Sequence, residues 1–328
     1  MKLAVVGCTG LVGSVILKVL SEISLPISEL ILVASSKSIG KLIEFDNKEF
    51  KIESIQSALS KNPSIAIFAA GGDFSKKWAN QFAEKGTTVI DNSSAWRMKE
   101  NIPLIVPEIN GFSLASHHKI ISNPNCSTIQ MVLALKEIHD RLKIKRLVVS
   151  TYQSVTGTGV AAVKQMMNER KGLDADMVYP HKIDQNCFPH GGDFLEDGYT
   201  TEEVKLENET KKIFNDSAIQ VTATVVRIPV IGGHSMAVNI ETENAFNIND
   251  IHNALEATPG VVIQNDNINN DYPMPITAQE KNEVFVGRIR LDKTVKNGLN
   301  LWIVADNLRK GAATNAVQIA QYLITNQL

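Results

Sequence analysis

The fold is decided by the stretch Leu3-Ala4-Val5-Val6-Gly7-Cys8-Thr9-Gly10-Leu11-Val12-Gly13. Its apolar run, residues 3–6, predicts a buried strand that ends at Gly7. Residues 14–23 then carry apolar side chains at helical spacing, which predicts a helix directly after the glycine-rich turn. A strand, a tight turn and a helix in this order begin a βα unit of a parallel sheet.

The alternation of strands and helices continues through the first third of the chain. Further apolar runs at residues 30–34, 65–70 and 88–90 predict strands, and residues 75–85 have helical spacing. Strands that alternate with helices in this way are typical of a doubly wound, Rossmann-like parallel sheet. We therefore expect an α/β protein whose first domain covers residues 1–125.

The hydrophobic pattern changes after about residue 125. Four long runs alternate between apolar and polar residues, at 146–154, 218–229, 235–242 and 284–291. This pattern predicts a largely antiparallel sheet with one covered face, in an α+β second domain over residues 126–306. Residues 307–328 have the spacing of a helix with one apolar side, and we expect this helix to fold back onto the first domain.

Composition narrows the functional class. A chain of 328 residues with 44% hydrophobic residues can bury the cores of two domains. A net charge of −2 gives no general attraction for nucleic acid or an acidic membrane, so a small ligand is expected. Cys8, Cys126 and Cys187 have neither disulfide-framework nor zinc-site spacing, which predicts no metal site and a reducing compartment. No signal-peptide or membrane-spanning run is present, so we expect a cytoplasmic location.

The glycine-rich turn is a candidate dinucleotide site. Gly7, Gly10 and Gly13 let the backbone turn sharply and bring amide groups and a helix N-terminus against a pyrophosphate. The spacing differs from the usual G-x-G-x-x-G, and a plain tight turn is the alternative. The expected cofactor contacts here are Gly7, Thr9, Gly10, Leu11, Val12 and Gly13.

The second predicted strand bears on the choice between NAD and NADP. NAD-binding proteins usually carry an acidic residue there for the ribose hydroxyls, but residues 30–41 contain none. Ser35, Ser36 and Lys37 suit a 2′-phosphate instead, which favours NADP over mixed use or an ordinary polar loop. After the run 65–70, Ala70 and Gly71 have no side chains to obstruct a cofactor, although a plain turn explains them equally.

Cys126 is the candidate nucleophile. It lies in Ser122-Asn123-Pro124-Asn125-Cys126, directly before the helical pattern 129–142. A helix N-terminus stabilises a thiolate, and its free amides stabilise an oxyanion when the sulfur attacks a carbonyl. Cys8 and Cys187 are interpreted as small buried hydrophobic residues.

Two polar residues are candidate partners of the nucleophile. His234 follows Gly232 and Gly233, so we expect it in a loop between two strands, where a base is accessible. Gln153 comes at the end of a strand and before a turn of small residues, where its amide can hold substrate or water.

Several motifs together resemble the aspartate-β-semialdehyde dehydrogenase family, in the same order along the whole chain. They are Gly7-Cys8-Thr9-Gly10-Leu11-Val12-Gly13, Asn123-Pro124-Asn125-Cys126-Ser127-Thr128, Tyr152-Gln153-Ser154-Val155-Thr156-Gly157-Thr158-Gly159 and Arg227-Ile228-Pro229-Val230 leading to Gly232-Gly233-His234. The resemblance implies a two-domain fold with an NADP-binding domain, completed by the C-terminal helix, and a catalytic and dimerisation domain. It also implies at least a homodimer, or a homotetramer.

The resemblance implies a role for each residue of the site. Cys126 is the acyl nucleophile, His234 the acid/base and Gln153 the residue that orients the intermediate. Arg227 binds the substrate carboxylate and Glu202 its amino group, while Asn125 steadies the oxyanion. Phosphate is bound by Arg97, in Ser93-Ser94-Ala95-Trp96-Arg97, and by Lys205, in Glu202-Glu203-Val204-Lys205; further cofactor contacts are Ser154, Gly157 and Asn315. Without the resemblance, residues 201–212 read equally as an exposed, solvated helix.

The implied reaction is NADPH-dependent reductive dephosphorylation of β-aspartyl phosphate to aspartate semialdehyde through a thioester on Cys126. Two alternatives stay open. One is a related enzyme such as N-acetyl-glutamyl-phosphate reductase, whose substrate lacks the free amine that Glu202 would bind. The other is a catalytically silent NADP-binding protein, which the presence of Cys126, Gln153 and His234 disfavours.

Overall fold

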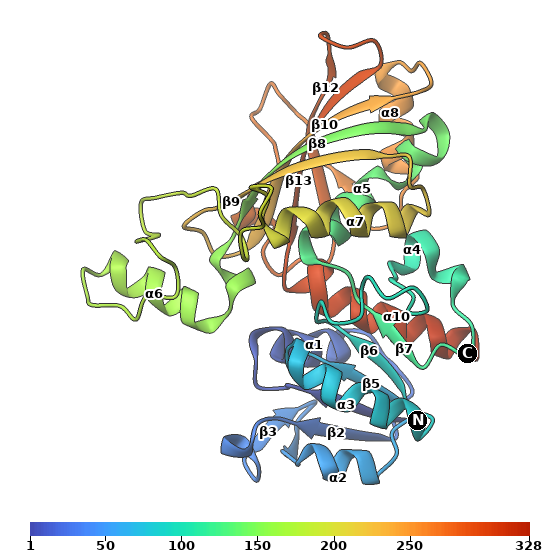
Figure 1. Cartoon of the computed structure of the whole chain (residues 1–328), viewed down its shortest axis with the longest axis vertical. Coiled ribbons are helices and arrows are strands. Elements are labelled where there is room, and N and C mark those ends of the chain that lie inside the picture. The colour runs from blue at the N-terminus through green and yellow to red at the C-terminus, as the bar shows by residue number, and fades with distance from the viewer. The chain divides into compact units, whose positions relative to one another are not determined.

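A computed structural model describes residues 1–328, and the chain divides into two compact units. The first comprises residues 1–125 and 312–328, and the second comprises residues 126–311. Figure 1 labels helices and strands of both units where there is room. The C-terminal boundary lies at Gly311, so residues 307–311 belong to the second unit, although the sequence pattern assigned them to the C-terminal helix.

The first unit is built on a five-stranded parallel sheet, which confirms the predicted Rossmann-like fold class. The strand order is β2-β1-β5-β6-β7. Every strand of the sheet is almost completely buried, because parallel sheets are covered on both faces and their strands read as continuous apolar runs. The bounds are β1 (Lys2–Val6), β2 (Glu29–Val33), β5 (Ile65–Phe68), β6 (Thr88–Asp91) and β7 (Ile120–Ser122).

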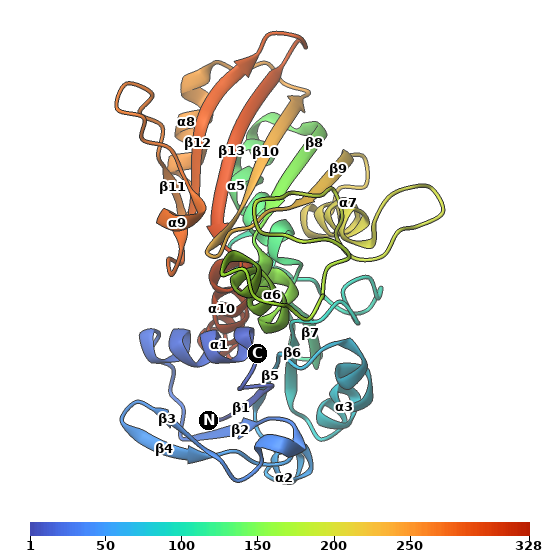
Figure 2. The same ribbon diagram turned by 90° about the vertical axis from the view of Figure 1, so that its left-hand side faces the viewer.

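Helices cover the two faces of this sheet (Figure 2). Because successive side chains of a strand point to opposite faces, Leu3 and Val5 pack with α1 (Leu11–Glu22) and α10 (Thr314–Thr325). Ala4 and Val6 pack with α2 (Ile55–Ser60) and α3 (Gly72–Glu84). The C-terminal helix α10 thus contributes side chains to the core of the first unit.

A short hairpin in the first unit was not predicted. Strands β3 (Leu42–Phe45) and β4 (Lys48–Lys51) pair antiparallel around Asp46 and Asn47, both of which have positive φ. Two consecutive positive φ values are the mark of the two-residue turn that matches the twist of a hairpin. Three short elements complete the unit, namely η1 (Ser36–Ser38), α4 (Pro107–Asn110) and η2 (Gly111–Ser113).

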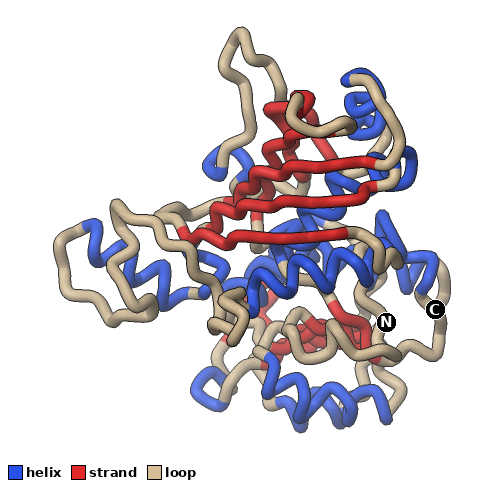
Figure 3. Tube along the Cα trace, turned by 45° about the horizontal axis from the view of Figure 1, so that its top comes forward, coloured by secondary structure: helices blue, strands red, loops and turns tan.

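The second unit contains a six-stranded mixed sheet in the order β11-β12-β13-β10-β8-β9, whose strands are red in Figure 3. The three inner pairs are antiparallel, as predicted, but the edge pairs β8–β9 and β11–β12 are parallel. The bounds are β8 (Ile144–Gln153), β9 (Gln220–Arg227), β10 (Gly233–Thr242), β11 (Val261–Ile263), β12 (Val284–Asp292) and β13 (Gly298–Asp306).

One face of this sheet is covered by helices of the same unit. The helices α5 (Cys126–Leu142), α7 (Thr201–Phe214) and α8 (Ile248–Glu256) pack on it and form the larger core. Side chains on the other face, among them Tyr152 and Trp302, are only half-buried. The alternation of apolar and polar residues in these strands therefore corresponds to a sheet with helices of the same unit on one face.

Between β8 and β9 the chain makes a long excursion that the sequence did not predict. It begins with η3 (Val155–Thr158) and α6 (Val160–Arg170) and has a small core of its own. The Glu169 carboxylate accepts hydrogen bonds from the backbone N–H groups of Ile183 (2.8 Å) and Asp184 (2.9 Å), which holds the returning segment. The remaining elements are α9 (Pro275–Ala278) and the π-helical turn Arg309–Ala313, whose last two residues already belong to the first unit. None of the helices has the length and apolar character to cross a membrane.

Candidate active site

The predicted nucleophile, Cys126, is the first residue of α5 and is partly buried. Its helix is 17 residues long. The backbone N–H groups of a first helical turn have no partner within the helix and carry partial positive charge. The thiol is therefore at a position where a thiolate, or an oxyanion formed next to it, is stabilised.

Gly311, a residue that the sequence did not single out, packs directly against the nucleophile. A Cβ atom built on Gly311 would lie 3.0 Å from the Cβ atom of Cys126 and 3.3 Å from its Cα atom. The π-helical turn that carries Gly311 can approach α5 this closely only because glycine has no side chain. A glycine in an otherwise helical segment was the available signal.

Gln153 connects the sheet to the start of the nucleophile's helix. It is the last residue of β8, is 1% exposed, and its Nε2 donates a hydrogen bond to Oγ of Ser127 at 2.9 Å. Ser127 follows Cys126 directly and is itself completely buried. Gln153 thus fixes the first turn of α5, and with it the position of the thiol, relative to the sheet.

The predicted loop position of His234 is wrong. His234 is the second residue of β10, pairs with Ala305 of β13, and is completely buried. Gly233 permits this pairing, because a Cβ atom there would lie 2.6 Å from the carbonyl oxygen of Ala305. The residues that bury His234 are distant in the sequence, so its local glycine context suggested an open loop.

The protonation of His234 is governed by its surroundings. Burial lowers its pKa to about 3, and the positive charge of Arg227 contributes in the same direction, while the negative charge of Glu202 opposes them. Nδ1 accepts a hydrogen bond from the backbone N–H of Ser154 at 3.0 Å, and Nε2 has no partner within the protein. His234 is thus a neutral imidazole with one unsatisfied ring nitrogen.

Arg227 and His234 converge on Gly157. Arg227 is the last residue of β9, is 7% exposed, and donates from Nη1 to the carbonyl oxygen of Ser154 at 2.8 Å. A Cβ atom built on Gly157 would lie 3.1 Å from Nε2 of His234 and 3.3 Å from Nη1 of Arg227. The missing side chain at position 157 thus allows His234 and Arg227 to lie close to the same point of the backbone.

Glu202 and Lys205 lie in the first turn and a half of α7 and form an ion pair, with Nζ of Lys205 2.8 Å from Oε2 of Glu202. Residues three positions apart point to the same side of a helix, so this pairing is the one that the sequence predicted. Thr200 caps α7 in a capping box with Glu203, which fixes where the helix begins. The negative charge of Glu202 acts at a distance on His234 and opposes the lowering of its pKa.

In the first unit, the glycine-rich turn has the geometry that a dinucleotide requires. Gly7 has φ 90°, and a Cβ atom there would lie 2.5 Å from the carbonyl oxygen of Ala69. A Cβ atom on Gly13 would lie 2.1 Å from the carbonyl oxygen of Gly7. The turn is consequently tight enough to present the N-terminus of α1 at the carboxyl end of β1, where the strand order reverses between β2 and β5.

The other predicted cofactor contacts of the first unit lie at the same edge of the sheet. Ser35, Ser36 and Lys37 follow β2 and are exposed. Ala70 and Gly71 follow β5 and are also exposed, and Gly71 has φ 87° at the start of α3. No carboxylate follows β2 directly, so these residues fit a nucleotide with a 2′-phosphate.

Arg97 and Asn315 take part in one buried network of the first unit. Arg97 donates from Nε to the carbonyl oxygen of Asn123 at 3.0 Å and from Nη2 to that of Asn92 at 2.8 Å. Asn315 is completely buried and donates from Nδ2 to the carbonyl oxygen of Ile105 (2.9 Å) and to Oδ1 of Asn123 (2.7 Å). Asn315 therefore anchors α10, and its contact with a cofactor stays a prediction. Asn123, which sequence reasoning did not single out, links both residues.

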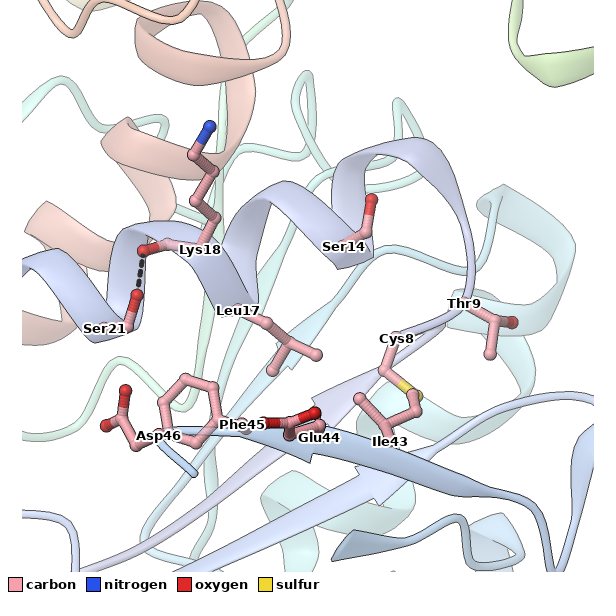
Figure 4. Close-up of a pocket in the computed structure, with 10 residues that line it drawn as sticks. All are labelled: Cys8, Thr9, Ser14, Leu17, Lys18, Ser21, Ile43, Glu44, Phe45 and Asp46. Carbon is pink, nitrogen blue, oxygen red and sulfur yellow. Dashed lines mark hydrogen bonds between the residues drawn. The ribbon is translucent and has the colours of Figure 1, made fainter. Parts of the chain in front are cut away.

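The remaining cysteines differ from each other. Cys8 is buried as expected, and burial raises its pKa to about 11, which makes it a poor nucleophile. It lines a pocket between α1 and the β3–β4 hairpin, together with Leu17, Lys18, Phe45 and Asp46 (Figure 4). Cys187 was expected to be buried but is exposed, because it lies in the excursion that the sequence did not predict. The structure contains no group of three or more His, Cys, Asp or Glu side chains that could hold a metal ion.

Comparison with known proteins relates both units to one family. Residues 2–117 match the family profile described as semialdehyde dehydrogenase, NAD binding domain. Residues 135–310 match the profile described as semialdehyde dehydrogenase, dimerisation domain. Cys126 lies between the two matched segments.

Individual relatives match along the whole chain. An aspartate-semialdehyde dehydrogenase of Aquifex aeolicus is 49% identical, over 100% of this chain and 99% of the relative. Aspartate-semialdehyde dehydrogenase 2 of Vibrio cholerae is 44% identical, over 98% of this chain and 97% of the relative. A crystal structure of aspartate semialdehyde dehydrogenase II of Vibrio cholerae, complexed with ASA, superposes with a TM-score of 0.95 at 43% identity, covering 100% of this chain and 99% of that one.

Proposed function

Since the chain belongs to the aspartate-semialdehyde dehydrogenase family, we propose that Cys126, His234 and Gln153 carry out the reaction of that family here. The family catalyses the NADPH-dependent reductive dephosphorylation of β-aspartyl phosphate to L-aspartate 4-semialdehyde. This reaction serves the biosynthesis of lysine through diaminopimelate, of threonine and of methionine. The observation that carries the residue assignment is the convergence of His234 and Arg227 on Gly157, in the unit that holds Cys126.

In the first step, the thiolate of Cys126 attacks the carbonyl carbon of the acyl phosphate. Asn125 and the backbone amides at the start of α5 steady the oxyanion while the C–O bond to phosphate breaks. Arg97 and Lys205 are the cations that bind the phosphate as it leaves. The product is a thioester, and the bond of Gln153 to Ser127 supports its orientation by fixing the first turn of α5.

NADPH, when it is bound by the residues assigned to it below, would supply a hydride for reduction of the thioester carbon. His234 interacts with the reacting oxygen as the acid/base residue, and breaking of the C–S bond returns Cys126 to the thiolate and releases the aldehyde. The absence of a side chain at Gly157 supports this role, because a Cβ atom there would lie only 3.1 Å from Nε2 of His234, which has no partner within the protein.

Recognition of an aspartyl group follows from opposite charges near the reacting centre. A guanidinium binds a carboxylate through two parallel hydrogen bonds, which suits Arg227 to the α-carboxylate. Glu202 suits the α-ammonium group, and an N-acetylated substrate would lack that charge. The electrostatic effect of Glu202 on His234 supports a position for Glu202 within reach of the same substrate.

The cofactor is NADP(H), and the first unit is the dinucleotide-binding domain of the family. Gly7, Thr9, Gly10, Leu11, Val12 and Gly13 are the residues that we assign to the pyrophosphate. Ser35, Ser36 and Lys37 are assigned to the 2′-phosphate, and Ala70 and Gly71 to the passage of the cofactor over the sheet edge. Ser154, Gly157 and Asn315 complete the proposed contacts.

We further propose a homodimer, or a homotetramer built from such dimers. The half-buried face of the six-stranded sheet, which carries Tyr152 and Trp302, supports an interface of this kind, and the second unit matches a dimerisation domain. The free thiols Cys8, Cys126 and Cys187 support a reducing, cytoplasmic location. Light scattering on the purified protein measures the mass of the assembly directly.

The test incubates the purified protein with NADP, phosphate and aspartate semialdehyde. We expect phosphate-dependent formation of NADPH, and its complete loss in Cys126→Ala. N-acetyl-glutamate semialdehyde, which lacks a free amine and is one methylene group longer, is the substrate of the alternative enzyme and should react far more slowly. No phosphate-dependent NADPH formation from either aldehyde would contradict the assignment, and full activity of Cys126→Ala would contradict the covalent route.

A further inference from the structure

We propose that Tyr179, in the excursion between β8 and β9, is a positioning residue for Arg227. Its aromatic ring holds the guanidinium in place and stabilises the positive charge without an acidic partner, so that Arg227 stays available for the carboxylate of the substrate. This inference deepens the proposed function and rests on it for the role of Arg227. It concerns a residue that the sequence did not single out.

Arg227 is a buried cation without an acidic partner. The residue is 7% exposed, its Nη1 donates to the carbonyl oxygen of Ser154, and its Nε has no hydrogen-bond partner. It forms no ion pair with a carboxylate of the chain, and Glu202 is paired with Lys205 instead. Because burial of a charge is costly unless other groups compensate for the lost water, a different group must stabilise the guanidinium.

The ring of Tyr179 is that group. Cζ of Arg227 lies over the ring at 5.9 Å from its centroid, which is within the range of a cation–π contact. Burial raises the pKa of the Tyr179 phenol, and the positive charge of Arg227 acts in the opposite direction, so the two side chains interact electrostatically. Unlike a carboxylate, an aromatic face stabilises a guanidinium without occupying its N–H donors in the plane of the group.

Tyr179 is itself held at both ends. Its backbone N–H donates to Oε1 of Gln165 at 3.0 Å, and Gln165, on α6, is almost completely buried. At the other end, the phenol hydroxyl donates to Oγ1 of Thr158 at 2.7 Å. The ring of Phe188 packs edge-on against that of Tyr179, with 5.3 Å between the centroids. The ring therefore cannot swing away from Arg227 without breaking these contacts.

The same excursion also fixes the backbone of Arg227. The backbone N–H of Arg227 donates to the carbonyl oxygen of Phe188 at 2.9 Å, and the N–H of Phe188 donates to the carbonyl oxygen of Arg227 at 3.2 Å. Figure 1 shows the excursion, with α6, beside the end of β9. Arg227 is consequently held by this one segment through both its backbone and its side chain.

Two substitutions separate the ring of Tyr179 from its hydroxyl. Tyr179→Leu removes the ring, whereas Tyr179→Phe removes only the bond to Thr158. We expect Tyr179→Leu to raise KM for aspartate semialdehyde about tenfold, the equivalent of losing a desolvated cation–π contact. Its kcat and its KM for phosphate and for NADP should stay nearly unchanged, and Tyr179→Phe should keep a nearly normal KM for the aldehyde. An unchanged KM in Tyr179→Leu, or an equal rise in both variants, would overturn the proposal.

Phe188→Leu is the matched control for packing. Phe188 belongs to the same small core as Tyr179, and its ring makes no cation–π contact with Arg227. The two leucine variants should therefore lower the Tm by similar amounts, while Phe188→Leu keeps a nearly normal KM for aspartate semialdehyde. If Phe188→Leu raises this KM as much as Tyr179→Leu does, the effect belongs to the packing of the excursion and the proposal is wrong.

A second measurement needs no turnover. In the full protein labelled with 15N-arginine, the Nε–H signal of Arg227 is assigned by its loss in Arg227→Lys, and 15N relaxation reports how rigid the side chain is. We expect a rigid Nε–H in the unaltered protein and in Tyr179→Phe, and a mobile one in Tyr179→Leu. An equally rigid Arg227 in Tyr179→Leu would overturn the proposal. Failure of the proposed function shows itself separately, as a lack of NADPH formation by the unaltered protein.

Discussion

The side-chain amide of Gln153 and the hydroxyl of Ser127 are joined by a hydrogen bond of 2.9 Å, although the two residues lie on different elements and are both buried. The bond connects the end of β8 to the first turn of α5. Since Cys126 opens that turn, this bond helps to set the position of the thiol relative to the sheet. A substitution at Gln153 should thus affect catalysis more than folding.

We expect Gln153→Ala to lower kcat by about 10²-fold, because a small displacement of a reacting group is known to cost that much. Thr151→Val is the matched control, since Thr151 is buried in the same strand and its hydroxyl has no hydrogen-bond partner. The measurement is kcat of both variants from steady-state kinetics, compared with kcat of the unaltered protein. If Thr151→Val loses as much activity as Gln153→Ala, the effect belongs to the strand and not to the bond.

Gly311→Ala should change the reactivity of the nucleophile. The new methyl group would press against Cβ of Cys126 from 3.0 Å and displace the start of α5 by a few tenths of an ångström. We expect kcat to fall about tenfold and the free energy of unfolding to fall by about 1 kcal/mol, as for mild overpacking. The rate of alkylation of Cys126 measures the local effect, with the exposed Cys187 as an internal reference. Unchanged alkylation of Cys126 would show that the close contact is unimportant.

Lys37→Glu should weaken the preference for NADP. Lys37 is exposed directly after β2, and a hydrogen bond to a charged group contributes about 1.5–3 kcal/mol. The ratio of kcat/KM for NADPH over NADH should therefore fall by about tenfold or more. Lys41→Glu makes the same charge change at another exposed position of the loop and should leave the ratio nearly unchanged. Equal effects of both substitutions would indicate a general electrostatic attraction instead.

Asn315→Ala separates anchoring of α10 from a contact with the cofactor. The substitution leaves the carbonyl oxygen of Ile105 and Oδ1 of Asn123 without this donor in a buried site, at a cost of about 2–3 kcal/mol. Thermal unfolding should show a lower Tm than for Gln318→Ala, which removes a contact with Glu108 from a less buried part of the same helix. An unchanged Tm together with a raised KM for NADPH would instead favour the direct contact.

The sequence predicted best where one local pattern determined the structure. The strands of the first sheet are continuous apolar runs that are buried on both faces, so their positions could be read within a few residues. The hairpin β3–β4 was not predicted, because its side chains are half-buried or exposed and form no apolar run. The excursion after β8 escaped because polar contacts such as those of Glu169 hold it, and these join residues distant in the sequence.

The site residues show the same division. The helix start at Cys126 and the common side of Glu202 and Lys205 follow from local spacing, and the structure has both. The burial of His234 depends on pairing of β10 with β13, and the hydrogen bond at its Nδ1 comes from the backbone N–H of Ser154, which follows β8. Neither feature is visible in the residues around His234. Gly157 and Gly311 are important because they have no side chain and so allow other groups to approach closely. A pattern of side chains in the sequence does not predict such close approaches.

His139 should make stability depend on pH between about 5.5 and 7.5. Burial lowers the pKa of His139, with the carboxylate of Asp216 opposing this shift, while the unfolded chain binds a proton near pH 6.5. As the pH falls below that value, the unfolded state takes up more protons than the folded state, so the free energy of unfolding decreases by up to about 1.4 kcal/mol per pH unit. His139→Gln removes this group and should show a shallower decrease than the unaltered protein in urea unfolding at the two pH values. His181→Gln, at an exposed position, should keep the full decrease. The same slope in His139→Gln and in the unaltered protein would mean that other groups, such as the buried His234, cause the acid sensitivity.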